Sequence, residues 1–300
     1  MLGSLLSQRG RRVGPSPIQL NRGSQFARGL VGWWPVGNQA CWGTDTLLDM
    51  SLYDNDGTVV SVPAEKWSIA DGRSCITLDG VSDYVDIADS PSMDVSGNAI
   101  TLMGWHNTTT IDDYDLLIGK EVNGNPYQIW ALFVGSASGT KHQKIVFAIS
   151  TSATRTLFDF DTGIDLRNNL HHYCGVYDGA NMLIYLDGAL QGSTAKTGNI
   201  DTNNNKVRIA KSEFYAGERL QGPVDDVRIY NRALSAGEVA QLYNETKDGS
   251  YGSLALPTGP RIWAVDTTAA AASGVVTSLI GEGGMIGYGG MISRGGGMIR

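Results

Sequence analysis

Short runs of β-branched and aromatic residues, separated by turn-forming residues, are the feature that most limits what this chain can fold into. From residue 30 onward the runs are bounded by Gly, Asn and Asp, which is typical of strands joined by tight turns. Asp187-Gly188 lies between two such runs and predicts a hairpin turn, because both residue types tolerate a positive φ. We therefore predict strands that include Cys75–Leu78, Tyr84–Ile87, Ile100–Trp105, Lys144–Ile149 and Met182–Leu186.

One segment, Leu234–Tyr243, has a helical pattern instead. Ser235 is placed as an N-cap and Glu238 follows three residues later, which is the spacing of a capping box. Val239, Leu242 and Tyr243 then share one helix face. A many-stranded body with a single short helix is typical of an all-β fold of two packed sheets.

Composition agrees with one folded body that carries tails. Hydrophobic residues make up 42% of the 300 residues and charged residues 18%, which is enough apolar material to bury a core. A sandwich of about 200–250 residues is routinely a single domain. The three cysteines, Cys41, Cys75 and Cys174, have no zinc spacing and an odd count, so we expect buried structural thiols. No run approaches the about 20 apolar residues of a membrane span, and the N-terminus lacks the pattern of a secretion signal.

Charge is distributed unevenly along the chain. Residues 1–28 carry five arginines and no acid, which gives +5. Residues 29–248 carry a net charge of −13, and the whole chain carries −7. Two interpretations stay open for this basic arm, a solvated tail or a segment that docks on an acidic partner surface. Nucleic acid is a weaker candidate, because the acidic body would repel phosphate, and we expect no nucleic-acid partner. The docking interpretation depends on Arg9, Arg11, Arg12 and Arg22.

Four ordered blocks resemble the laminin G-like domains of the concanavalin A-like lectin/glucanase superfamily. The blocks are Gly29–Pro35 with Leu48–Thr58, Leu78–Val85, His171–Gly188 and Gly222–Ser235. The resemblance implies a curved two-sheet antiparallel jelly-roll sandwich with one short C-terminal helix. We expect it over residues 29–247, between an extended basic arm at 1–28 and a Gly-rich extension at 248–300. It implies no particular ligand, since one fold hosts many functions.

Catalysis is not expected from these residues. Glucanases of this fold need two carboxylates that point into one groove, and no Glu-x-Asp-x-x-Glu cluster is present. Asp159-Phe160-Asp161 has alternate spacing, but its neighbours indicate a turn. We therefore predict a protein that is not an enzyme and has no catalytic residues.

Calcium is the cofactor that the resemblance implies, since relatives hold an ion with an acid of the closing strand and groups near the domain start. By position these ligands are Asp225 and Asp49. The family often has an acidic pair after its opening Trp-Pro, where this chain has Gly37 and Asn38. The alternative is that Asp225 caps a turn.

Aromatic residues are the candidates for glycan binding, because their faces stack on sugar rings. Trp33 and Trp105 lie in apolar runs and are expected in the core. The candidates for a glycan groove are Trp42, Trp67, Tyr127 and Trp130.

The C-terminal extension repeats Gly-Gly-Met-Ile three times between residues 283 and 299. It is interpreted as a low-complexity linker or as an anchor that buries its Met-Ile pairs in a homo-oligomer, for which we expect a trimer. The anchor residues are Met285, Ile286, Met291, Ile292, Met298 and Ile299.

A laminin G-like domain that follows a short Arg- and Pro-containing leader resembles proteins encoded by bacteriophages. This resemblance implies a virion structural protein, as capsid decoration or a tail or fibre component, located in the virion. Its expected partners are capsid or tail subunits and cell-surface or mucosal glycans. The alternative is an extracellular or cell-surface bacterial carbohydrate-binding module, and then a degenerate glycoside hydrolase.

Overall fold

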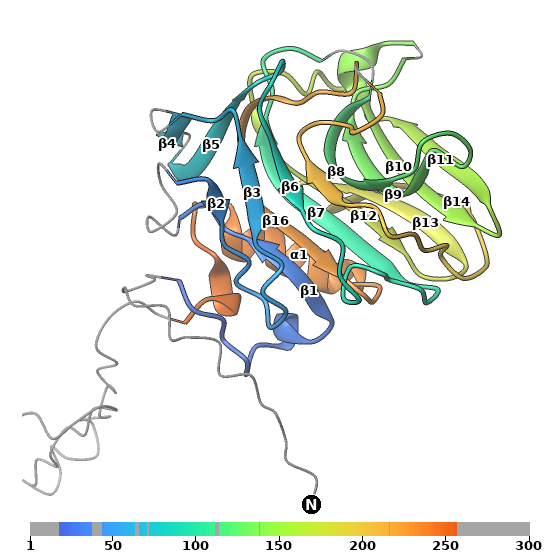
Figure 1. Ribbon diagram of the computed structural model, residues 1–300, viewed down its shortest axis with the longest axis horizontal. Helices are drawn as coiled ribbons and strands as arrows, with labels where there is room; N and C mark the ends of the chain where they lie inside the picture. The colour runs from blue at the N-terminus through green and yellow to red at the C-terminus, as the bar shows by residue number, and fades with distance from the viewer. Residues whose placement is uncertain are drawn as a thin grey trace, which may run out of the picture. The chain divides into compact units, whose positions relative to one another are not determined.

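The computed structural model describes residues 18–37, 44–63, 66–70, 72–111, 114–137, 139–215 and 217–256. Figure 1 shows these residues as a two-layered β-structure. The predicted glycan residue Trp42, the arm residues Arg9, Arg11 and Arg12, and all six anchor residues of the C-terminal extension lie outside the described residues.

Two antiparallel sheets of eight strands each form the body within the described residues. The first sheet has, in spatial order, β14 (Ala189–Ala195), β13 (Asn181–Leu186), β12 (Leu170–Tyr177), β7 (Ile100–Asn107), β16 (Gln221–Tyr230), β5 (Arg73–Asp79) and β4 (Trp67–Ala70), with β1 (Leu30–Trp34) paired to β16. The second has β11 (Thr154–Asp161), β10 (Lys144–Thr151), β9 (Gln128–Val134), β8 (Asp115–Glu121), β15 (Val207–Ile209), β6 (Tyr84–Ile87), β3 (Gly57–Val60) and β2 (Thr46–Leu47). The predicted jelly-roll sandwich and the strands expected from the sequence are confirmed.

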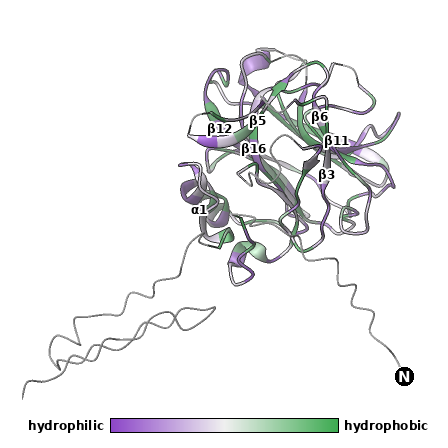
Figure 2. Cartoon of the chain, turned by 60° about the vertical axis from the view of Figure 1, so that its left-hand side comes forward, coloured by the Kyte–Doolittle hydropathy of each residue, from purple (hydrophilic) through white to green (hydrophobic). Residues whose placement is uncertain are grey.

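Successive side chains of a strand point to opposite faces of the sheet, and this alternation decides which of them enter the main core. In β9, Trp130 and Leu132 point into the layer between the sheets, whereas Ala131 and Phe133 belong to a small cluster on the outer face of the second sheet. The strands carry the hydrophobic residues, and α1 is mostly hydrophilic (Figure 2). Trp33 and Trp105, expected in the core, are 0% and 2% exposed.

The outer face of the first sheet is covered by the helix α1 (Ala236–Thr246) and by the short 3₁₀ helices η1 (Gln25–Ala27) and η5 (Gly252–Leu254). Val239 and Leu242 of α1 pack in this cluster. The helix begins with the predicted capping box, in which the Ser235 side chain accepts from the Glu238 N–H and the Glu238 carboxylate accepts from the Ser235 N–H. A third 3₁₀ helix, η4 (Lys141–Gln143), precedes β10.

The predicted domain boundaries need correction at both ends. Residues 18–28 were assigned to the arm, yet Ile18 and Phe26 are buried at 5% and 0% exposure. The Asn21 N–H donates to the Leu254 carbonyl at 2.7 Å, so this segment lies beside the chain that follows α1. The compact unit ends at Leu256 rather than at 247. In the described part of the chain, no helix is both long and apolar enough to cross a membrane.

The turn chemistry is as expected. Asp187 and Gly188 connect β13 to β14 with φ angles of 52° and 77°, as a two-residue hairpin of this type requires. The Asp187 carboxylate accepts from the His172 N–H at 2.9 Å and also contacts Nδ1 of His171 at 2.7 Å. The two adjacent histidines therefore hold a turn in place. Cys75 and Cys174 are free, buried thiols.

Candidate functional site

The two carboxylates predicted as calcium ligands both lie beside β1. Asp225 accepts from the Val36 N–H at 2.7 Å and from Nη1 of Arg73 at 2.9 Å. Asp49 accepts from the N–H groups of Trp33 at 2.9 Å and Asn55 at 2.8 Å. Donor groups of the protein therefore surround each carboxylate.

This arrangement is a poor match for calcium, which needs several oxygen ligands. The Arg73 guanidinium already supplies a positive charge beside Asp225, and both side chains are at most 1% exposed. Among the described residues, no three His, Cys, Asp or Glu side chains are grouped so as to hold a metal ion. The resemblance predicted calcium at Asp225 and Asp49, and the donor groups that surround both carboxylates argue against that prediction.

Of the aromatic residues predicted to bind a glycan, two lie in the core. Trp67 and Trp130 are 4% and 0% exposed, so their ring faces pack against the protein and cannot stack on a sugar. That part of the prediction is corrected. Both rings point inward because their positions in β4 and β9 fall on the core side of the sheet. Tyr127 differs, since 39% of it is exposed.

Tyr127 lies in the tight connection between β8 and β9. Its carbonyl accepts from the Val122 N–H at 2.7 Å, and its own N–H donates to the Gly124 carbonyl at 2.5 Å. Its φ is 71°, an uncommon value for a residue with a side chain. The backbone therefore holds the ring in a defined place at the end of the second sheet.

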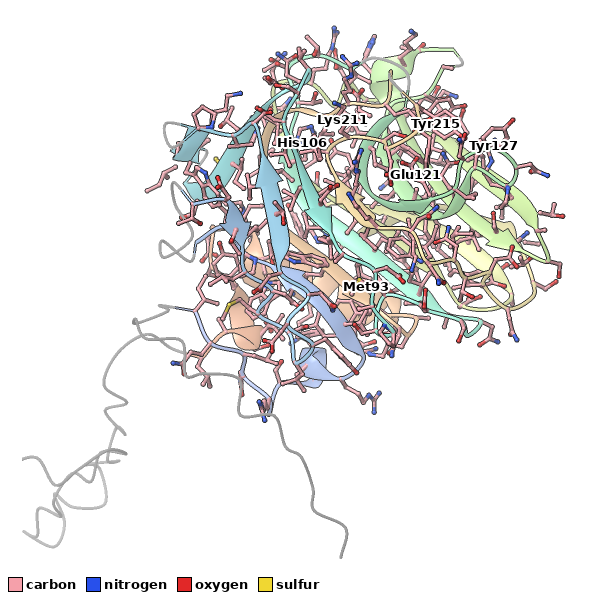
Figure 3. All side chains as sticks on the ribbon, viewed as in Figure 1. Met93, His106, Glu121, Tyr127, Lys211 and Tyr215 are labelled. Carbon is pink, nitrogen blue, oxygen red and sulfur yellow. The ribbon has the colours of Figure 1, made fainter. Side chains whose placement is uncertain are left out.

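A second loop brings another tyrosine beside this ring. Lys211 and Arg219 form an antiparallel bridge that closes the loop 211–219. The Ser212 hydroxyl accepts from the Tyr215 N–H at 2.9 Å and so shapes the turn. The rings of Tyr127 and Tyr215 have centroids 5.6 Å apart, and Figure 3 shows both near Glu121.

Polar side chains continue from the two tyrosines onto the outer face of the second sheet. The guanidinium carbon of Arg155 lies 4.7 Å from the centre of the Tyr127 ring, and Nη1 of Arg155 donates to Oε1 of Gln128. Nε2 of Gln128 donates to Glu121 at 3.3 Å. A small pocket of about 70 Å³ lies here, lined by Tyr114, Gln128, Phe133, Arg155, Leu157 and Glu218. We call these lining residues, together with Glu121, Tyr127 and Tyr215, the Tyr127 site.

The Tyr127 site contains two carboxyls in contact. Burial, followed by the negative charge of Glu121, raises the pKa of Glu218 to about 8. Oε2 of Glu218 is buried without a hydrogen-bond partner among the described residues. A proton on Glu218 removes the repulsion and lets this carboxyl donate to Glu121, which lies within hydrogen-bonding reach. At neutral pH the raised pKa therefore favours the protonated form of Glu218.

This pair does not have the geometry of a glycosidase. Retaining enzymes hold their two carboxyls about 5–5.5 Å apart and inverting enzymes about 6.5–9.5 Å, because the scissile bond or a water lies between them. Glu121 and Glu218 are close enough for a direct hydrogen bond. The Asp159-Phe160-Asp161 segment is the end of β11, and a bend follows it at residues 163–164. Asp159 is held by a hydrogen bond from Ser136 at 2.5 Å.

Sequence reasoning found one residue of the Tyr127 site and missed the others. Glu121 and Glu218 are far apart in the chain, and no short motif connects them. They meet because β15 runs antiparallel to β8, away from Glu121, and the loop 211–219 that follows returns, so that the Glu213 N–H donates to Glu121 at 3.0 Å. Arg22, the one described residue of the predicted docking set, lies exposed in the turn before η1.

Comparisons with known proteins agree with this fold. A laminin G family model, described as concanavalin A-like lectin/glucanases superfamily, matches residues 79–240. No curated protein matches the sequence significantly.

Several solved structures have the same fold at low sequence identity. The binding domain of Paraclostridial Mosquitocidal Protein 1 aligns with a TM-score of 0.55 and 19% identity, over 73% of this chain and 53% of that one. Domain 4 of AbnA, an extracellular GH43 arabinanase from Geobacillus stearothermophilus, was solved in complex with arabinotriose. It aligns with a TM-score of 0.52 and 17% identity, over 70% of this chain and 96% of that one. The receptor-binding domain of the botulinum neurotoxin C/D mosaic serotype aligns with a TM-score of 0.51 and 12% identity, over 72% of this chain and 51% of that one. The chain thus spans about half the length of both toxin domains.

Proposed function

Because the chain belongs to the concanavalin A-like lectin/glucanases superfamily, we propose that it is a carbohydrate-binding domain whose glycan docks at the Tyr127 site. One observation carries this proposal. An exposed tyrosine ring stands beside a pocket whose walls offer an amide, a guanidinium and a carboxyl. An aromatic face with a few convergent polar groups is the usual composition of a sugar site.

The polar groups can both donate hydrogen bonds to sugar hydroxyls and accept hydrogen bonds from them. Arg155 is a donor only, Gln128 both donates and accepts, and Glu121 accepts. Apolar side chains of Phe133 and Leu157 line the same pocket and can contact the carbon face of a pyranose. The arabinanase domain, solved with an oligosaccharide, supports the use of this fold for sugar binding.

Binding takes place without turnover in this proposal. The hydrogen-bonded carboxyl pair leaves no space between its members for a glycosidic bond or an attacking water. The protonated member serves instead as a donor for a sugar oxygen or for Glu121.

Replacing Tyr127 tests the site directly. We expect Tyr127→Ala to weaken the binding of oligosaccharides found on a glycan array by about tenfold or more, which corresponds to about 1.4 kcal/mol. Leu190→Ala is the control, since Leu190 is exposed on β14 and lines no part of the pocket. Affinities are measured by isothermal titration calorimetry, with reducing ends assayed in parallel. Unchanged affinity in Tyr127→Ala would show that the glycan does not bind at the Tyr127 site. Sugar release by wild type that disappears in Glu218→Gln would show that the protein hydrolyses glycans.

The setting of this domain is proposed from the sequence. We infer a virion component that is attached through its N-terminal arginines, presents the Tyr127 site to cell-surface or mucosal glycans, and self-associates through the Gly-Gly-Met-Ile segment. The support is the contrast between a basic first segment and an acidic body. The alternative setting is a bacterial cell surface.

A further inference from the structure

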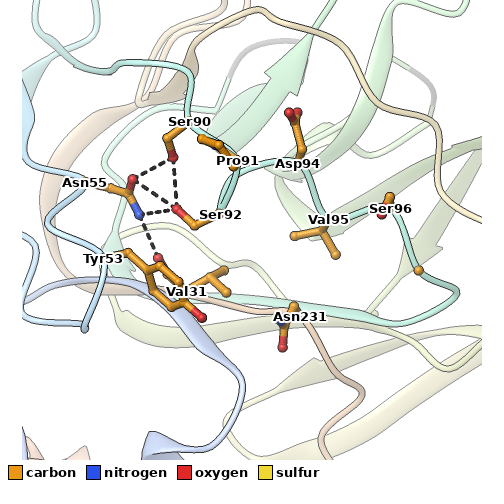
Figure 4. A pocket seen from close by; sticks show the side chains of 11 residues that line it. Val31, Tyr53, Asn55, Ser90, Pro91, Ser92, Asp94, Val95, Ser96 and Asn231 are labelled. Atoms are coloured by element: carbon orange, nitrogen blue, oxygen red, sulfur yellow. Dashed lines mark hydrogen bonds between the residues drawn. The ribbon is translucent and has the colours of Figure 1, made fainter. Parts of the chain in front are cut away.

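A second, larger groove lies away from the Tyr127 site. It has a volume of about 700 Å³, which is within the range of about 300–1,000 Å³ typical of small-molecule sites. Four parts of the chain line it, namely Val31 of β1, the loop between β2 and β3, the loop between β6 and β7, and the residue after β16 (Figure 4). Met93 of the loop between β6 and β7 lies far from Tyr127 and Tyr215 in Figure 3. The two places are therefore separate surfaces of the domain.

The floor of this groove is held by Asn55. Its Nδ2 donates to the Val31 carbonyl and to Oγ of Ser92, both at 2.9 Å. Its Oδ1 accepts from Ser90 at 2.7 Å and from Ser92 at 3.2 Å. Asn55 is 7% exposed and its side chain uses its full hydrogen-bonding capacity, so both hydroxyls are fixed before any ligand arrives.

These fixed hydroxyls have acceptor capacity to spare. A serine oxygen has one proton and two lone pairs; the Ser90 and Ser92 hydroxyls both donate to Oδ1 of Asn55, and Nδ2 of Asn55 takes one lone pair of Ser92. Each hydroxyl therefore keeps a lone pair for a donor in the groove. The donors that fit are hydroxyl groups of a ligand.

The walls add an aromatic ring and an unused amide. Tyr53 is 49% exposed, and its side chain makes no hydrogen bond to the described residues. The side-chain amide of Asn231 likewise has no hydrogen-bond partner in the described part of the chain. A ring face together with a free amide can contact both the apolar and the polar parts of a sugar.

The charge of the groove excludes anions. Among its described lining residues, Asp94 alone is charged. Its Oδ1 lies 2.6 Å from Nζ of Lys120, which also binds Asp89 at 2.7 Å. One buried ammonium between two carboxylates leaves a net negative charge, so a uronate or sialate would be repelled.

We propose that this groove is a second carbohydrate site, independent of the Tyr127 site, that takes a neutral pyranose. Fixed acceptor hydroxyls, a free amide, an exposed ring and the absence of a positive charge on the lining all match a ligand rich in uncharged hydroxyls.

The test is a titration of the full chain with neutral monosaccharides, namely glucose, galactose, mannose and N-acetylglucosamine, against glucuronate and N-acetylneuraminate. Binding is followed by calorimetry and by NMR of the amides in residues 90–97. We expect one or more neutral sugars to bind, with affinity lowered about tenfold or more in Tyr53→Ala and in Asn231→Ala. Both residues are exposed, so neither change should unfold the domain.

Controls separate the two sites. Leu52→Ala removes a neighbouring exposed side chain that does not line the groove, and it should leave binding unchanged. Tyr127→Ala should also leave it unchanged. Neutral-sugar binding that survives in Tyr53→Ala but is lost in Tyr127→Ala would assign the signal to the other site and overturn the groove. A wild-type chain that binds none of the neutral sugars, or binds the acidic ones equally well, would overturn it as well.

Discussion

A carboxyl that stays protonated at neutral pH is the most unusual residue-scale feature of the Tyr127 site. Glu218 faces Glu121, while Arg155 offsets part of the repulsion. Hydrogen bonds hold both residues next to each other. The Glu121 carboxylate accepts from the Glu213 N–H at 3.0 Å, and the Glu218 carbonyl accepts from the Ser212 N–H at 2.9 Å. The proton therefore belongs to the folded arrangement and is released on unfolding at neutral pH.

This proton makes stability depend on pH. The pKa of Glu218 is about 8 in the fold against 4.5 for a free side chain, so the folded state binds the extra proton between these values. Stability from this group is thus present below about pH 4.5 and is lost as pH rises through about 8. We expect Glu218→Gln, which stays neutral, to melt about 2 °C or more above wild type at about pH 9, and the two to converge at about pH 5.

The control is Glu213→Gln, an exposed acid in the same loop. Melting is followed by circular dichroism or calorimetry across this pH range. A Glu218→Gln variant with the same pH slope as wild type would show that Glu218 is already ionised in the fold.

At the scale of elements, Arg73 connects β5, β16 and the end of α1. Its guanidinium binds Asp225 on β16 at 2.9 Å and donates to the carbonyl of Thr246. It also lies 4.4 Å from the centre of the Trp105 ring on β7. One buried cation thus joins strands of the first sheet to the helix that covers it.

This role leads to a prediction about metal removal. Because Arg73 already neutralises Asp225, we expect chelation with EDTA to leave the melting temperature unchanged. Arg73→Met, in contrast, leaves a buried carboxylate unpaired and should cost about 3–5 kcal/mol. A melting temperature that falls in EDTA and is restored by calcium chloride would instead establish the ion at Asp225 and Asp49.

At the scale of the whole molecule, the two sheets have different outer faces. Helix α1, η1 and η5 cover the first sheet, whereas the second carries the Tyr127 site on its outer face. Because residues 18–28 pack with the chain that follows α1, a truncation that preserves the fold must begin at residue 18 rather than after the predicted arm.

The truncated chain 18–256 tests the proposed setting. It retains the described core, so we expect it to fold with an unchanged melting temperature. We also expect it to be a monomer by light scattering and to be absent from purified virus particles, since it lacks both terminal segments. Chains that lack only residues 1–17 or only residues 257–300 separate attachment from self-association. Normal incorporation of chain 18–256 would place attachment within the domain.

The sequence by itself determined the strands, the Asp187-Gly188 hairpin and the Ser235–Glu238 capping box, because each depends on chemistry within a few consecutive residues. Only the tertiary structure decided which aromatic rings are exposed. Trp130 and Tyr127 lie close together in the chain, yet the strand buries one and the turn exposes the other. The pairing of Glu121 with Glu218, and the groove between Tyr53 and Asn231, likewise depend on strand order, which brings together residues that no local pattern connects.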